Sequence, residues 1–148
     1  MAIEIANQVI LLIYFLQIKV HIIKTTNKQN GDGIQRIVKA TMCSFFGFKA
    51  AWLHESAFRQ ELVLSILLLP FSFYLAQSRL HWLLLLSCLL FVLFAEIINS
   101  AVEALADSIT LEQHPLIGRA KDLGSSGVFI ALAFLVVVWG EALLNLFM

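Results

Sequence analysis

Three uncharged and largely apolar runs stand out in the later part of the chain, at residues 62–78, 80–95 and 123–140. Each run is close to the length that a bilayer requires, because about 20 helical residues cross roughly 30 Å of hydrocarbon. The pattern therefore predicts three transmembrane helices, at about residues 56–76, 80–107 and 118–146.

The segment at residues 33–53 has a different pattern, in which apolar side chains recur at the spacing of a helix. It is too polar to cross a bilayer, so we expect an amphipathic helix on the cytoplasmic membrane surface, with Trp52 as an interfacial anchor. Residues 1–30 are interpreted as an extension of uncertain structure, and residues 31–148 as the membrane-embedded domain. The apolar stripe of the surface helix consists of Ile34, Ile37, Val38, Thr41, Phe45, Phe48 and Trp52.

Composition and charge support the membrane interpretation. With 60% hydrophobic and 14% charged residues, a water-soluble globule would expose large apolar patches. The formal net charge of zero gives no electrostatic footprint for nucleic acid. Basic residues precede the first span and lie between the second and third, so we expect the N-terminus and second loop in the cytoplasm and the C-terminus on the opposite side. Cys43 and Cys88 are interpreted as packing residues.

Polar residues interrupt the apolar pattern near the end of the second span. Their helical spacing places them on one face of the helix. Charges at membrane depth are energetically unfavourable, so those that occur usually serve a function. If the span enters the hydrocarbon near His81, Glu96 lies roughly 22 Å along the helix, just inside the cytoplasmic boundary, and Glu103 roughly 33 Å along, among the headgroups. The set is Glu96, Asn99, Ser100, Glu103 and Asp107.

Two further groups of charged residues belong to the same membrane boundary. Glu55 and Glu61 begin the first span, and Glu55 together with Glu103 would offer Mg²⁺ the oxygen ligands that it prefers. Arg119 and Lys121 fall at the start of the third helix, where free backbone N–H groups favour phosphate. Mutual pairing of the acids and a simple anchoring role for the basic residues stay open at this point. The Gly124–Gly127 run is interpreted as helix packing.

Three segments carry a resemblance to a known family. They are AAWLHESAFRQE at residues 50–61, AEIINSAVE at 95–103 and GRAKDLGS at 118–125. In this order and spacing they resemble the signature segments of the small prokaryotic diacylglycerol kinases. The resemblance implies an all-α homotrimeric helical bundle with a surface helix and three transmembrane helices per subunit, and composite active sites. It also implies Mg²⁺-dependent transfer of the ATP γ-phosphoryl group to membrane diacylglycerol in a bacterial inner membrane.

The resemblance further implies residue roles. Glu96 and Asn99 would be catalytic, Glu96 as the general base and Asn99 as a polar positioning group, while Glu55 and Glu103 would bind Mg²⁺. Two alternatives are an undecaprenol kinase of the same superfamily and a non-enzymatic membrane scaffold or proton relay. Nucleotide contacts are implied for Arg36, Cys43, Glu55, Glu103, Glu112, His114, Lys121 and Asp122. A lipid route is implied along Arg36, Ala40, Ser44, Phe45, Lys49, Trp52, Ala57, Arg59, Glu61, Glu96 and Ser125.

Overall fold

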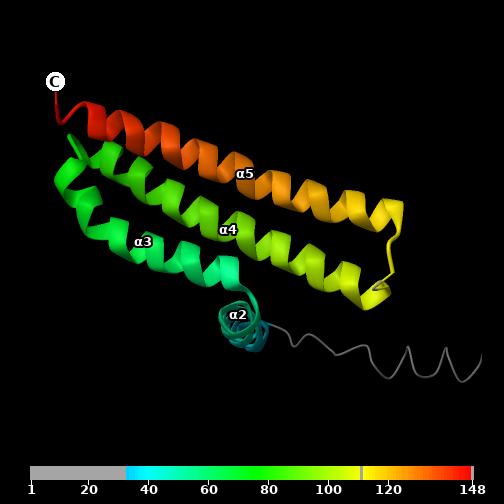
Figure 1. Cartoon of the computed structure of the whole chain (residues 1–148). Coiled ribbons are helices and arrows are strands. Elements are labelled where there is room, and N and C mark those ends of the chain that lie inside the picture. The colour runs from blue at the N-terminus through cyan, green and yellow to red at the C-terminus, as the bar shows by residue number, and fades with distance from the viewer. Residues whose placement is uncertain (1–32, 111, 148) are drawn as a thin grey trace, which may run out of the picture. The chain divides into compact units, whose positions relative to one another are not determined.

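The computed structural model describes residues 33–110 and 112–147, and these residues form helices without any strand. The helices are α2 (Ile34–His54), α3 (Ser56–Leu75), α4 (Arg79–Ile109) and α5 (Pro115–Leu144) (Figure 1). By length and composition α3, α4 and α5 are each able to cross a membrane. The all-α class, the helix before the spans and the three candidate spans are therefore confirmed. The predicted extension at residues 1–30 lies outside the described residues.

The chain divides into two compact units, with the division between Ser44 and Phe45, and each is described by itself. In the first unit, residues 34–44 form the beginning of α2 and all are exposed. The hydroxyls of Thr41 and Ser44 donate to carbonyl oxygens one turn back, at 3.0 and 3.1 Å, so their polar groups are satisfied within the helix. Exposed apolar side chains such as Ile34 and Ile37 suit a lipid-facing stripe, and the surface location stays a prediction.

In the second unit, α4 lies between α3 and α5 (Figure 1). The connections are short, so neighbouring helices run antiparallel. Local sequence sets the helix starts. Ser78 caps α4 by accepting a hydrogen bond from the His81 backbone N–H at 3.1 Å. Pro115 occupies the first turn of α5, where its missing N–H and fixed φ do no harm, and His114 caps that helix.

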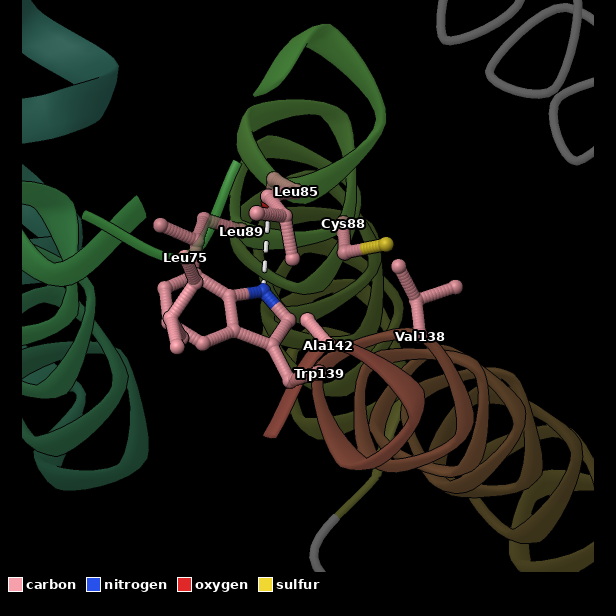
Figure 2. Close-up of a cluster of buried hydrophobic side chains, with 7 residues drawn as sticks. All are labelled: Leu75, Leu85, Cys88, Leu89, Val138, Trp139 and Ala142. Atoms are coloured by element: carbon pink, nitrogen blue, oxygen red, sulfur yellow. Dashed lines mark hydrogen bonds between the residues drawn. The ribbon is translucent and has the colours of Figure 1, made fainter. Parts of the chain in front are cut away.

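A cluster of buried apolar side chains holds the three helices together at the end where α3 joins α4 (Figure 2). The indole Nε1–H of Trp139 on α5 donates to the Leu85 carbonyl oxygen on α4 at 3.2 Å. Cys88 is fully buried in this cluster, which confirms its interpretation as a packing residue, whereas Cys43 is exposed on α2 and its interpretation stays a prediction. The cluster consists of Leu75, Leu85, Cys88, Leu89, Val138, Trp139 and Ala142.

Most other large apolar side chains of the spans point outward and are exposed. A water-soluble protein would bury them, but in a bilayer the hydrocarbon of lipid tails covers them at no cost. The helices satisfy their own backbone hydrogen bonds, as any segment in hydrocarbon must. The outward apolar surface therefore agrees with the membrane location that the composition predicts.

Candidate active site

The polar face of α4 points into the protein at the end remote from the apolar cluster. Glu96 is only 4% exposed, and Asn99 and Ser100 are each 9% exposed. Glu103 is half-buried, and Asp107, one turn further, is exposed. The helix therefore keeps Glu96, the carboxyl group placed deepest along the span, away from lipid, as the unfavourable solvation of charge in hydrocarbon requires.

Asn99 connects this face to the neighbouring helix. Its Nδ2 donates to Glu103 Oε1 at 3.1 Å, a contact between side chains four residues apart on one helix face. Its Oδ1 is buried and has no hydrogen-bond partner within the described part of the chain. On α5, Gly124 lies directly against the same amide, so the two helices approach closely here.

Carboxylates from three places gather around Glu96. Glu103 and Glu55 both act electrostatically on the Glu96 carboxyl group, and Glu96 acts on Glu61 of α3. Glu55 sits at the N-cap position of α3 but its side chain makes no capping hydrogen bond, so its oxygens stay available. One oxygen of Glu61, Oε2, is buried and lacks a hydrogen-bond partner among residues 33–110 and 112–147. The fold thus brings several carboxyl groups, those of Glu55, Glu61 and Glu103, within electrostatic range of Glu96.

The donors around Glu96 fit a magnesium ion that arrives with a nucleotide. No group of three or more His, Cys, Asp or Glu side chains that could hold a metal occurs in the part of the chain that the structure describes. Mg²⁺ rarely needs such a cage, because it keeps several waters and usually takes one or two carboxylates plus substrate phosphates. Glu55 and Glu103 supply oxygen donors of that kind, and neither is fully buried.

A cleft of about 530 Å³ opens where α4 ends and α5 begins. Its volume is in the range of pockets that hold small-molecule ligands. It brings together Glu112, His114 and Lys121, three of the residues to which the family resemblance gives nucleotide contacts. Asp122 does not line it. The lining residues are Asp107, Thr110, Glu112, Gln113, His114, Pro115, Ile117, Gly118 and Lys121.

The start of α5 corrects one detail of the sequence prediction. The helix begins at Pro115, three residues earlier than the 118 expected, so Arg119 and Lys121 lie beyond its first turn. The physical reason is local. His114 caps the helix, because its Nδ1 accepts a hydrogen bond from the Leu116 N–H at 3.3 Å, and Pro115 is favourable in the first turn that follows. The anion-favouring helix terminus is thus at residues 114–117, of which His114, Pro115 and Ile117 line the cleft.

Lys121 reaches across to α4, where its Nζ donates to Asp107 Oδ1 at 2.9 Å. The pair is partly exposed, with 36% of the lysine and 51% of the aspartate side chain accessible. A solvent-exposed pair of this kind contributes little to stability. The pair matters more for its position, because both residues line the cleft and Lys121 also interacts electrostatically with Glu103.

The other predicted contacts are distributed over both units. Arg36, Ala40, Cys43 and Ser44 are exposed residues of the first unit. In the second unit, Phe45, Lys49, Trp52, Ala57 and Ser125 are exposed as well, which leaves them accessible to lipid. Arg59 has a structural contact, since its Nη1 donates to the Trp52 carbonyl oxygen at 2.8 Å and to that of Leu53 at 3.4 Å. It closes the carboxyl end of α2, a role that basic side chains often take there.

Sequence reasoning did not single out Thr110 and Gln113, which also line the cleft. Thr110 Oγ1 accepts from the Glu112 backbone N–H at 3.0 Å, at the end of α4. The signal was available, because threonine followed two residues later by a free N–H commonly forms such a turn at a helix end.

The fold and the site define a class: a helical membrane protein with a buried carboxyl group on the inward face of one span and a ligand-sized cleft where the second and third spans are connected. Comparison with known proteins is more specific. The family model described as prokaryotic diacylglycerol kinase matches residues 42–143. The chain belongs to this family, as the three signature segments predicted.

Relatives with that name share nearly half of the aligned positions. The diacylglycerol kinase of Haemophilus influenzae is 42% identical over 111 residues, which cover 75% of this chain and 94% of the relative. That of Pseudomonas aeruginosa is 44% identical over 113 residues, covering 76% and 92%. That of Escherichia coli K12 is 44% identical over 110 residues, covering 74% and 90%. The similarity therefore spans almost the whole of each relative.

Proposed function

We propose that this protein is an ATP-dependent diacylglycerol kinase of a bacterial membrane. The free hydroxyl of diacylglycerol attacks the γ-phosphorus of ATP, the bond from that phosphorus to the β-phosphate oxygen breaks, and phosphatidic acid and ADP result. Membership of the family supports the reaction, because the relatives carry the name diacylglycerol kinase. The single observation that carries the placement of the site is the buried Glu96 carboxyl group on the inward face of a helix able to cross the membrane.

Glu96 is proposed as the general base. A hydroxyl must lose its proton as it forms the new bond to phosphorus, and a positioned carboxylate is a suitable acceptor. The lipid hydroxyl lies near the level where headgroup meets hydrocarbon. The position of Glu96 along α4 puts its carboxyl group at about the same depth, which supports this role. Burial keeps bulk water from the attacking position, so transfer to water is disfavoured.

Glu55 and Glu103 are proposed to hold Mg²⁺ together with the phosphates. When bound, the ion would neutralise phosphate charge and align the γ-phosphoryl group. The chain itself orients one of the two carboxylates, because the Asn99 amide donates a 3.1 Å hydrogen bond to Glu103.

The cleft at the start of α5 is proposed as the nucleotide site. Since His114 Nδ1 accepts the Leu116 N–H, the neutral imidazole carries its hydrogen on Nε2, which can then donate to a nucleotide oxygen or nitrogen. The Lys121 ammonium uses one hydrogen for Asp107 and has two more for phosphate oxygens. The contact predicted for Asp122 is part of the same proposal and rests on the family resemblance. The nucleotide contacts of Arg36 and Cys43, in the first unit, stay predictions from that resemblance.

The proposal includes an inner-membrane location, a cytoplasmic N-terminus and second loop, and a homotrimer with composite sites. The distribution of basic residues supports the orientation. The outward apolar side chains of the spans suit contact with lipid and with other subunits. Chemical cross-linking in detergent would test the subunit number, and a ladder that stops at dimer would contradict the trimer.

A direct assay tests the reaction. The purified chain is mixed with ATP labelled at the γ-phosphate, Mg²⁺ and micelles that contain either diacylglycerol or undecaprenol, and label is followed into lipid. We expect labelled phosphatidic acid and little labelled undecaprenyl phosphate. Label only in undecaprenyl phosphate would assign the protein to the alternative substrate, and no label in either lipid would favour the non-enzymatic scaffold.

A further inference from the structure

Gly124 on α5 occupies a position where a side chain has no room. A Cβ atom built there would lie 2.6 Å from Asn99 Oδ1 on α4, closer than real Cβ contacts allow, and 3.6 Å from Asn99 Cγ. The Asn99 Cα is 3.7 Å away, an ordinary contact distance. The clash therefore involves the end of the Asn99 side chain and leaves the two helix backbones undisturbed.

The other glycines of α5 do not share this environment. A Cβ atom at Gly127 or Gly140 meets nothing within 4 Å among the described atoms. The close approach is thus specific to Gly124 and Asn99, and the other glycines of α5 do not take part in it.

The amide at Asn99 has little freedom to escape such a clash. It is 91% buried, and its Nδ2 is engaged with Glu103 Oε1 at 3.1 Å. Exchange of the oxygen and nitrogen by a half-turn would not relieve the overlap, since the two atoms are of similar size. It would also turn a carbonyl oxygen toward the Glu103 carboxylate, and two acceptors repel. The amide must therefore move, and a movement of Oδ1 away from position 124 also displaces Nδ2 from Glu103 Oε1.

We infer that Gly124 is a positioning residue for phosphoryl transfer, because its missing side chain keeps the Asn99 amide donating to the carboxylate of Glu103. This inference rests on the proposed function, in which Glu103 holds Mg²⁺. Groups that orient a metal ligand typically contribute about 10- to 100-fold in metal affinity or activity. Gly124 acts through Asn99 and touches neither substrate nor metal in this role.

Gly124→Ala tests the inference in the full-length protein. We expect kcat to fall about 10-fold or more and the Mg²⁺ concentration for half-maximal rate to rise several-fold. The melting temperature should change little, since the better helix propensity of alanine opposes the cost of displacing the Asn99 amide. Gly127→Ala is the matched control, one turn away, and should keep the wild-type Mg²⁺ dependence. An unchanged Mg²⁺ dependence in Gly124→Ala, or the same change in Gly127→Ala, would overturn the inference.

A double-mutant cycle separates action through Asn99 from plain helix packing. If Gly124 acts through Asn99, Gly124→Ala should raise the melting temperature more in an Asn99→Ala protein than in the wild type, because the obstructing amide is gone. Equal shifts in the two backgrounds would reject the coupling. The melting temperature is measured without catalysis, so this test is independent of the proposed function. The proposed function itself would be contradicted by a wild-type protein that transfers no label to diacylglycerol.

Discussion

Replacement of Glu96 by glutamine is the sharpest test of the mechanism. Glutamine has nearly the same shape as glutamate, so it fits a site where the side chain is 4% exposed. It cannot accept a proton from a hydroxyl. General base catalysis contributes about 10²- to 10⁴-fold to a rate, which corresponds to about 3–5 kcal/mol in the activation barrier. We therefore expect Glu96→Gln to lower kcat by about that factor.

The same replacement should leave the fold at least as stable as before. Glu103 and Glu55 both act on the Glu96 carboxyl group, and both carry the same sign of charge. Removal of one charge from this group relieves repulsion, so the thermal unfolding midpoint should stay constant or rise. Activity and stability are thus predicted to move in different directions, which excludes unfolding as the cause of a lost rate.

The measurement is the initial rate of label transfer from γ-labelled ATP at saturating diacylglycerol, alongside thermal unfolding followed by circular dichroism. Glu141→Gln serves as the control. Glu141 lies at the other end of α5 and is 3.7 Å from His81, so its replacement should leave kcat near that of the wild type. A Glu96→Gln protein that retains more than about one tenth of the wild-type kcat would refute the role as general base.

Two further predictions address the cleft and the packed end of the spans. Lys121→Met should raise KM for ATP about 10-fold and leave stability almost unchanged, because the pair with Asp107 is partly exposed. Steady-state kinetics with varied ATP measure KM, and an unchanged KM would contradict the nucleotide site. Trp139→Phe removes the hydrogen bond to the Leu85 carbonyl oxygen and part of a buried ring, so it should destabilise the protein by about 1–2 kcal/mol with kcat retained below the unfolding transition. Chemical denaturation in detergent measures the stability change, and a loss of kcat without loss of stability would contradict a purely structural role for Trp139.

Periodicity alone was sufficient for most of the fold. Uncharged runs of the required length gave three spans, and the helical spacing at residues 33–53 gave the helix before them, because both patterns reflect constraints that the bilayer imposes on any chain. Helix ends were less accurate. α5 starts at Pro115 because of a histidine cap, which depends on side-chain geometry at one position and not on a repeated pattern.

The site was predictable to the extent that its residues share one helix. Glu96, Asn99 and Glu103 follow from spacing on α4, and the structure places the first two in the interior. The contact of Asn99 with Gly124 was not predictable, since it depends on how far α5 is shifted along α4, and no spacing within one segment contains that information. The sequence reading assigned the Gly124–Gly127 run to helix packing, and only the register between the helices separates Gly124 from Gly127.

The burial pattern of α4 bears on why the polar groups are there. Its buried residues form one continuous stripe with helical spacing, apolar toward the Trp139 end and polar toward the cleft. If packing were the only requirement, we would expect leucine or alanine at these buried positions, and the next buried residue, Ala106, is of this kind. A buried carboxyl group in that stripe lowers stability unless it is paired, and Glu96 faces other acids. Such a local conflict with the packing rule is typical of a functional site, and it disfavours a scaffold, which gains nothing from the conflict. The stripe consists of Leu85, Cys88, Leu89, Val92, Glu96, Asn99, Ser100 and Ala106.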